Sequence, residues 1–280
     1  MEGKADMDSL LAALIGHRGV NEPQQAVVYS HSHDEVGNSG RWVIRSAAGS
    51  VKEDDVMAAW PRAMGRTAAA ITLTSTGVPM IWQGEENLAN NDFKHAMPQT
   101  WGADMGWLKT PVTPDRLDGF RNVSQMPADE KKAAVARMSA DDQRLFARYD
   151  AMSADERLRA EYDADKNGHF RLYCDLIHLR TSSPALAAGT GMSRIYTHNA
   201  DRVVAFTREA EGQQFAVVSN FSRNGYDRYN VNLPAGRWQV VLDTDDRVYG
   251  GSGGGPHGEV DGGQPLSLPA GATLVLKRIG

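Results

Sequence analysis

The chain has 280 residues, with 30 Lys and Arg residues against 35 Asp and Glu residues, so its formal net charge is −5 at pH 7. This acidic balance disfavours nucleic acid and an anionic membrane as partners. The one cysteine, Cys174, excludes a disulfide framework and a cysteine-rich zinc site within a single copy of the chain.

The first predicted element is a short amphipathic helix over residues 7–15. Its apolar residues recur at helical spacing, and Gly16 stands where the helix would end. The first eight residues are too polar for a signal peptide, and no apolar run in the sequence approaches the length of a membrane span. We therefore expect a cytoplasmic protein.

Two apolar runs further along the chain predict a pair of buried strands. Residues 26–29 form the first run and break into the polar stretch 30–35. Residues 78–82 form the second, which runs into Gln83-Gly84-Glu85-Glu86. A helix that has Pro61 in its first turn separates them. The order strand, helix, strand predicts a parallel sheet with a helical crossover.

From residue 109 to residue 167 the composition shifts to charged residues, Ala and Met, and the segment contains a near-repeat, MSADDQRLFARYDA and then MSADERLRAEYDA. Ser153 with Glu156 fits a helix capping box, and Ser139 begins a weaker version. Two copies are too few for a solenoid. The pattern predicts two short surface helices in a solvated insertion.

A further helix is predicted around residues 170–180, with Cys174 as a small buried hydrophobe. From about residue 195 short β runs alternate with turns, which predicts an antiparallel sandwich. The loop 250–263 is too rich in glycine to be a strand. The expected strands cover 203–206, 215–218, 229–233, 238–242 and 272–276.

The strongest local signal is His31-x-His33-Asp34 directly after the first predicted strand, where side chains of a barrel would point into the mouth of an active site. In one interpretation His33 donates hydrogen bonds to a sugar hydroxyl and the ionised Asp34 stabilises an oxocarbenium-like charge or orients the substrate. In a second, His31 and His33 ligate the metal of a hydrolase. In a third, these polar groups only satisfy one another. The spacing does not choose between them.

Four ordered blocks resemble the α-amylase family of retaining glycoside hydrolases. Residues 27–38 resemble the family's strand-seven motif, and their Ser-His-Asp-Glu-Val form is similar to that of the 1,4-α-glucan (glycogen) branching enzymes. Residues 77–86 resemble the eighth strand and the turn that follows it. The helix at 172–180 is similar to the last barrel helix. Asn220-Phe221-Ser222 and residues 233–238 and 249–251 resemble the C-terminal sandwich.

The resemblance implies an α/β plus all-β chain in two domains. Residues 1–190 would be the C-terminal part of a (β/α)8 TIM barrel, comprising strands seven and eight with flanking helices and the charged helical insertion at about 110–165. Residues 191–280 would be an antiparallel β-sandwich.

The resemblance also implies roles for individual residues. Asp34 would be the third catalytic carboxylate, which supports the transition state, and His33 would bind hydroxyls of the sugar at the reacting subsite. Gln83 and Trp101 would contact substrate. Glu86 would hold the loops near the site. His31 receives no catalytic role, and no metal and no cofactor are expected.

The chain departs from the family pattern at its start. Family members place the nucleophilic Asp after strand four and the acid/base Glu after strand five, whereas this sequence begins near helix six. A third carboxylate replaces neither residue. Two strands also do not close a barrel, so they would expose their edges and apolar faces. We therefore expect the C-terminal part of a longer enzyme, inactive alone.

The resemblance predicts an α-glucan-active enzyme that cleaves α-1,4-glucosidic bonds with retention. The cleaved glucan would be transferred to a sugar 6-hydroxyl, as in branching, or to water, as in an α-amylase. The expected partner is an α-1,4-glucan such as glycogen, starch or a maltooligosaccharide, with no nucleic acid and no membrane. The alternatives are a noncatalytic glucan-binding or partner-completing module and a metal-dependent hydrolase that uses His31 and His33.

Overall fold

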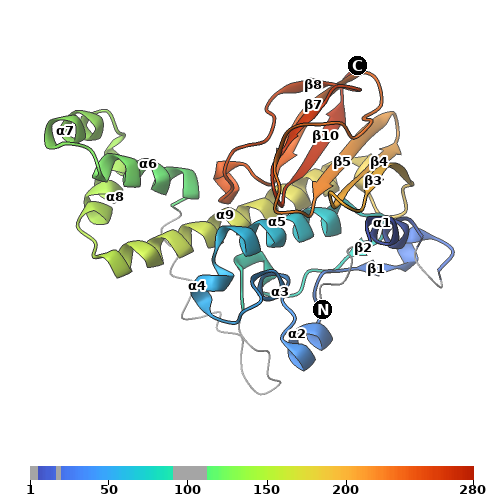
Figure 1. Cartoon of the computed structure of the whole chain (residues 1–280), viewed down its shortest axis with the longest axis horizontal. Coiled ribbons are helices and arrows are strands. Elements are labelled where there is room, and N and C mark those ends of the chain that lie inside the picture. Colours follow the sequence, from blue (N-terminus) through green and yellow to red (C-terminus); the bar gives the residue numbers. More distant parts are fainter. Residues whose placement is uncertain (1–5, 17–19, 91–111) are drawn as a thin grey trace.

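A layer of long helices carries an antiparallel sheet on one side and a short parallel strand pair on the other in the computed structural model of the chain (Figure 1). The structure describes residues 6–16, 20–90 and 112–280. Within those residues no helix combines the length and the apolar character that crossing a membrane requires.

The N-terminal helix α1 spans Met7–Ile15, as predicted. It begins at Asp6, whose carboxylate accepts hydrogen bonds from the backbone N–H groups of Asp8 and Ser9 and so satisfies donors that the first helical turn leaves unpaired. Gly16 ends the helix, because its N–H donates to the carbonyl of Ala12. The apolar side of α1 packs into the main core.

The predicted strand, helix, strand order is confirmed. Strands β1 (Val27–Val28) and β2 (Val78–Pro79) pair in parallel, with Val27 opposite Val78. Gly77 precedes β2 at a close approach, since a Cβ there would lie 2.5 Å from the Val28 side chain. The connection is helical and comprises α2 (His33–Ser39), α3 (Val43–Ala48), α4 (Glu53–Val56) and α5 (Ala59–Thr74).

The prediction that these two strands are buried is wrong. Val27 is 56% exposed, Tyr29 44% and Val78 43%. The physical reason is the size of the sheet: among the described residues β1 and β2 pair only with each other, so both strands are edges. Parallel sheets normally have both faces covered. The pair therefore presents the open edges and apolar side chains that two isolated barrel strands would present.

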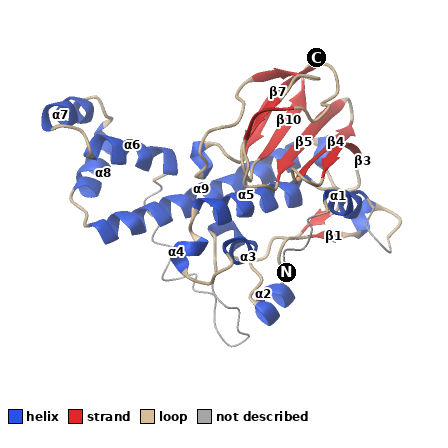
Figure 2. Cartoon of the chain, in the orientation of Figure 1, coloured by secondary structure: helices blue, strands red, loops and turns tan. Residues whose placement is uncertain are grey.

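Helix α5 lies against α9 (Ala154–Ser182) in the middle of the molecule (Figure 2). The last turn of α5 contains no basic residue, and arginines from other elements donate hydrogen bonds to its carbonyls. Arg180 of α9 donates to the carbonyls of Leu73 and Ser75 at 2.7 and 2.8 Å. Arg208 of the sheet donates to those of Thr74 and Ser75. These bonds end α5 and join the helices to the sheet.

The insertion is helical, but not as two short solvated helices. It contains α6 (Pro114–Ser124), α7 (Ala128–Ala136) and α8 (Ala140–Asp150), and the second copy of the repeat runs on into the 29-residue α9. The capping box of Ser153 and Glu156 is confirmed. The only glycine inside α9, Gly168, permits close packing, because a Cβ there would lie 2.9 Å from the Pro114 ring.

These helices bury a small core of their own, which a solvated insertion would lack. Its buried members are Leu117, Phe120, Val123, Phe146, Tyr149 and Ala164.

The prediction for the buried side of α9 is also wrong. Cys174 is exposed, as are Phe170 and Ile177, whereas Leu172 and Leu176 are buried. Apolar residues occur on two sides of this helix, and helical periodicity alone does not say which side meets α5.

The C-terminal part forms a six-stranded antiparallel sheet in the order β3-β4-β5-β10-β7-β8 and a second sheet of β6 and β9. The strands are β3 (Met192–His198), β4 (Val203–Ala210), β5 (Gln213–Asn220), β6 (Tyr226–Tyr229), β7 (Arg237–Asp243), β8 (Glu259–Asp261), β9 (Leu266–Leu268) and β10 (Thr273–Arg278). Short 3-10 turns complete the described elements: Pro23–Gln25, Glu85–Asn87, Pro184–Leu186 and Arg247–Tyr249.

The antiparallel sandwich is confirmed: three predicted strands fall inside β4, β5 and β7, and a fourth overlaps β10 but begins one residue before it. Two predictions are wrong. The chain leaves the strand conformation after Tyr229, and Asn232 has a positive φ of 55°. Strand β8 forms within the glycine-rich loop, because Val260 finds a partner in Trp238 of β7.

One face of the large sheet packs on α1, α5 and α9, and the other packs on β6 and β9. A single core therefore crosses the predicted boundary between residues 190 and 191, and that division into domains stays a prediction.

Candidate functional site

Polar side chains from two segments meet just beyond the ends of β1 and β2. Residues 30–35 follow β1, and residues 82–86 follow β2. Because the strands are parallel and in register, their carboxyl ends lie at the same edge. The structure thus brings together the two polar stretches that the sequence singled out.

His31 is buried at this edge and joins the two stretches. Its Nδ1 contacts Oε2 of Glu85, and its Nε2 accepts a hydrogen bond of 2.8 Å from the N–H of Val43. The Val43 contact requires an unprotonated Nε2, so the proton lies on Nδ1 and is donated to the Glu85 carboxylate. Trp42 packs beside the ring, with centroids 5.3 Å apart.

This arrangement bears on the metal interpretation, because both nitrogens of His31 already have hydrogen-bond partners. The side chain leaves no lone pair for an ion. Within residues 6–16, 20–90 and 112–280, no group of three His, Cys, Asp or Glu side chains has the geometry of a metal site. His31 instead holds the start of α3 against the turn after β2.

Glu85 is the residue of this site that sequence reasoning missed. It is buried and also accepts a hydrogen bond of 3.2 Å from the Ser30 hydroxyl. Burial raises the pKa of Tyr173 well above its usual range, and the adjacent Glu85, to which the phenol is hydrogen bonded, adds to that shift. The signal in the sequence is the pair of consecutive carboxylates, but their order does not reveal which one turns inward.

Glu86 is the outer member of that pair and is half-buried. Its Oε2 accepts a hydrogen bond of 2.7 Å from the N–H of Gly84, which closes the turn after β2. Burial raises the pKa of its carboxyl above the usual range. This hydrogen bond within the turn is compatible with the predicted role of Glu86 in holding the loops near the site. That role stays a prediction.

His33 and Asp34 lie in the first turn of α2, next to the edge of the strand pair. The hydroxyl of Ser32 caps this helix by accepting from the N–H of Asp34 at 3.2 Å. The His33 and Asp34 side chains are 61% and 68% exposed, and His33 Nε2 lies 3.5 Å from Asp34 Oδ1. The His33 ring also lies beside that of Trp82, at a centroid distance of 6.3 Å.

Two further residues, Gln83 and Trp101, were predicted to contact substrate. Gln83 is exposed in the turn after β2. Trp101 lies outside the described residues. The structure therefore groups His33, Asp34 and Trp82 on the surface above the buried pair of His31 and Glu85, and the catalytic and binding roles of the predicted residues stay predictions.

Comparison with known proteins identifies the C-terminal sheet region. The family pattern described as "Alpha amylase, C-terminal all-beta domain" matches residues 195–279. The chain carries the C-terminal all-β domain of the α-amylase family. The resemblance that the sequence motifs predicted is thereby confirmed.

Curated relatives match the chain as well. It is 38% identical over 124 residues to the 1,4-alpha-glucan branching enzyme GlgB 1 of Rhizobium johnstonii. It is 36% identical over 151 residues to the 1,4-alpha-glucan branching enzyme GlgB of Rhizobium meliloti. These stretches cover 39% and 48% of this chain but only 17% and 20% of the two relatives. The chain thus spans about a fifth or less of their length.

Solved structures with a similar arrangement include a mutant of the trehalulose synthase MutB and the isomaltulose synthase SmuA from Protaminobacter rubrum. The first is 20% identical with a TM-score of 0.48, over 97% of this chain and 45% of that one. The second is 20% identical with a TM-score of 0.44, over 84% of this chain and 41% of that one.

Proposed function

We propose that this chain is the C-terminal part of an α-glucan-active enzyme and supplies one side of its active site. The reaction is retaining cleavage of an α-1,4-glucosidic bond, followed by transfer to a 6-hydroxyl, as in branching, or to water. The observation that carries the proposal is the position of His33 and Asp34 at the shared end of β1 and β2, in a chain 36% identical over 151 residues to a 1,4-alpha-glucan branching enzyme.

Asp34 would act through charge. Cleavage develops an oxocarbenium-like positive charge on the sugar, and a carboxylate beside it stabilises that charge. The neighbouring imidazole of His33 would donate a hydrogen bond to a sugar hydroxyl. The nucleophile and the acid/base are two further carboxylates, which we place in a segment outside this sequence.

The strand pair itself supports a partial barrel. The side chains of Val27 and Val78 in the pair, and of Tyr29 just after β1, are exposed, and Phe170 and Ile177 on α9 are exposed as well. Additional strands that pair with β1 and β2 would cover the edges, as closure of a barrel does. We propose that such strands, numbering six, complete both the barrel and the set of catalytic carboxylates.

A complementation assay tests this proposal. The N-terminal segment of the Rhizobium meliloti GlgB, ending before the matched stretch, is co-expressed with this chain and assayed on maltoheptaose and amylose. We expect no turnover by the chain alone and measurable turnover by the pair. Asp34→Asn should lower kcat in the pair by orders of magnitude. Asp227→Asn, an exposed carboxylate on β6, is the matched control and should leave turnover unchanged.

Two outcomes would contradict the proposal. Turnover by the purified chain alone would show that no outside carboxylate is needed. Near-normal turnover by the Asp34→Asn pair would remove Asp34 from the catalytic set. The products distinguish the two acceptors, because new α-1,6 branch points indicate transfer and shorter linear chains indicate hydrolysis.

The open strand edges also favour a second candidate, a noncatalytic module that binds glucan and completes a partner. In both proposals β1 and β2 pair with strands of a partner segment. In the second, the completed protein binds glucan but does not cleave it. Binding of the partner segment without any turnover, in wild type and in Asp34→Asn alike, would select it. The predicted cytoplasmic location stays a prediction under both.

A further inference from the structure

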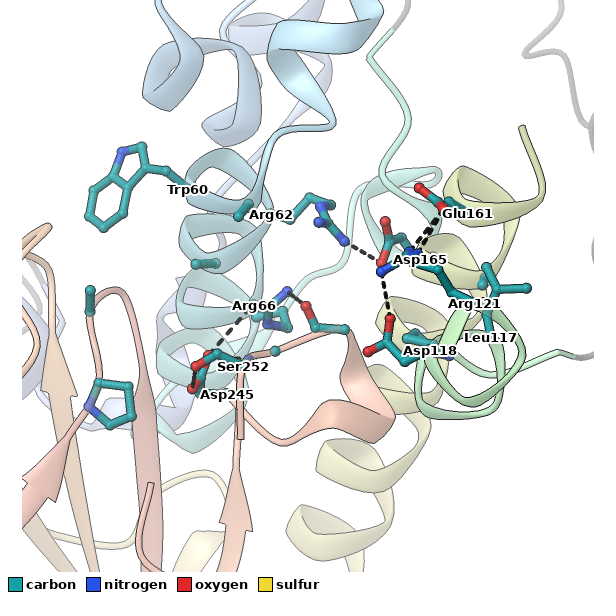
Figure 3. Close-up of a pocket in the computed structure, with 18 of the residues that line it drawn as sticks. Trp60, Arg62, Arg66, Leu117, Asp118, Arg121, Glu161, Asp165, Asp245 and Ser252 are labelled. Carbon is teal, nitrogen blue, oxygen red and sulfur yellow. Dashed lines mark hydrogen bonds and ion pairs between the residues drawn. The ribbon is translucent and has the colours of Figure 1, made fainter. Parts of the chain in front are cut away.

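A cavity of about 500 Å³ lies between the insertion, α5, α9 and the loops at one end of the C-terminal sheet (Figure 3). Its walls come from the first half of α5, from α6 and the first half of α9, and from the loops after β5, β7 and β9. None of its lining residues belongs to β1, β2 or the polar segments 30–35 and 82–86. The cavity is therefore separate from the candidate active site.

The charges that line the cavity balance. Its arginines are Arg62, Arg66, Arg121 and Arg223, and its carboxylates are Asp118, Glu161, Asp165 and Asp245. Four positive and four negative groups give no net field for an ion of either sign. The wall therefore favours a neutral ligand that both donates and accepts hydrogen bonds.

Arg121 forms ion pairs with two carboxylates of the cavity wall. Arg121 reaches Asp118 and Glu161, each at 2.9 Å, from α6 across to α9. Both carboxylates and the guanidinium are partly exposed to the cavity side. Hydroxyl groups that come in pairs, one accepting from the guanidinium and one donating to a carboxylate, match such a wall.

Arg62 and Asp165 form a second pair deeper in the cavity wall (Figure 3). Among the described residues the Nε of Arg62 is buried and has no hydrogen-bond partner. A buried donor without an acceptor is rare and calls for an explanation such as a bound group. Burial raises the pKa of Asp165 to about 6 although Arg62 and Arg66 oppose that shift. Both residues would gain from a hydrogen-bonding ligand.

Trp60 stands at the other end of the cavity from these ion pairs, as Figure 3 shows. Its ring is half-buried and lies under the guanidinium of Arg223, 4.6 Å from the ring centroid. Arg223 is exposed and lines the same cavity, so it moves without breaking the core. A flat aromatic surface at one end of a cavity with paired donors and acceptors at the other suits the apolar face and the hydroxyls of a saccharide.

We infer that this cavity is a second saccharide-binding site, which holds a short neutral oligosaccharide between Trp60 and the Arg121 cluster. The choice of an α-glucan as that oligosaccharide rests on the proposed function. The site gives the insertion a role, since α6 and the first half of α9 form one wall. The second site would hold one part of a long glucan on the protein while another part of the same glucan reaches Asp34.

Binding of maltoheptaose, measured by isothermal titration calorimetry on the full chain, tests the inference. Trp60→Ala should weaken binding about tenfold through loss of the stacking surface. Arg121→Gln should weaken it about threefold to tenfold through loss of a charge-assisted hydrogen bond. The controls are Phe170→Ala and Arg144→Gln, an exposed aromatic residue and an exposed ion-paired arginine outside the cavity, which should bind as wild type does.

A second variant guards against misfolding. Ala59→Trp adds bulk at an exposed lining position and should block binding while the thermal unfolding midpoint stays within about 2 °C of wild type. Unchanged affinity in Trp60→Ala, Arg121→Gln and Ala59→Trp would overturn the inference. If His33→Ala abolished binding while these three variants retained it, maltoheptaose would bind at the strand edge, and the proposed function would survive without the second site.

Discussion

The two strand systems of this chain differ in how completely they cover their apolar side chains. In the large sheet, Phe206 on β4 and Leu274 on β10 are fully buried, with strands on both sides and a layer on each face. In the strand pair, Val27 and Val78 are about half exposed and each strand has one described neighbour. The first system is a finished core, and the second leaves its apolar side chains partly exposed.

The finished core should respond most strongly to truncation. Phe206→Ala should lower the free energy of unfolding by about 3–5 kcal/mol, because it removes a fully buried ring and leaves a cavity. Tyr29→Ala, at the open strand edge, should lower it by less than about 0.5 kcal/mol. Chemical denaturation of both variants checks this. Equal losses would break the contrast between the two strand systems.

Arg208 should give the next largest effect. Its guanidinium is buried in the sheet and donates to the carbonyls of Thr74, Ser75 and Ala187 at 2.6, 2.7 and 2.7 Å. Arg208→Met removes the side-chain donor to the Thr74 carbonyl and one of the donors to each of the other two carbonyls, and should lower the free energy of unfolding by about 2–4 kcal/mol. Arg194→Met, an exposed arginine on β3, should lower it by at most about 1 kcal/mol. A cost for Arg208→Met no larger than for this control would contradict the joining role.

The sheet should also carry a pH dependence, through one buried carboxyl. Burial raises the pKa of Asp243, at the end of β7, to about 7. The folded state therefore holds a proton that the unfolded state releases near pH 4, so stability should fall as the pH rises from about 4 to 7. Asp243→Asn should remove about 2 kcal/mol of that fall, a figure that discounts the shift for relaxation of the site.

Asp34→Asn is the matched control for this pH dependence, because its carboxylate lies exposed at the strand edge. Unfolding free energies measured at pH 4.5, 6 and 8 should follow the wild-type curve in that variant. A wild-type curve for Asp243→Asn would show that its carboxyl is solvated in the folded protein.

The smallest effect on stability belongs to Cys174. The thiol is exposed on α9, although partial burial and the nearby Asp175 raise its pKa. We expect slow but complete modification by a maleimide in the native chain. Cys174→Ser should change the free energy of unfolding by less than about 0.5 kcal/mol. Resistance of the native chain to modification would contradict its exposure.

Patterns with a strong local cause were predictable from the sequence. The strands within β4, β5, β7 and β10 followed from apolar runs between turns, and the start of α9 followed from the capping box at Ser153. In the candidate site, the sequence placed His33 and Asp34 directly after a strand. These features depend on residues close together in the chain.

Features set by distant partners were not predictable. Cys174 was expected to be buried, because the helix has apolar residues on two sides and only α5 decides between them. Strand β8 forms in a glycine-rich loop because Trp238 supplies a partner. Of the two consecutive carboxylates, Glu85 and not Glu86 turns toward His31, because of the 3-10 turn at Glu85–Asn87. In each case tertiary contacts override local preference.

Hydrogen exchange of the strand pair tests the central claim most directly. In the chain alone, the amides of Val27, Val28 and Val78 should exchange orders of magnitude faster than those of β5 and β10, since the strand pair is open on both sides. Addition of the complementing N-terminal segment should slow exchange in β1 and β2 and leave β5 and β10 unchanged. Exchange in β1 and β2 that is already as slow as in β5, or that does not respond to the added segment, would contradict the account.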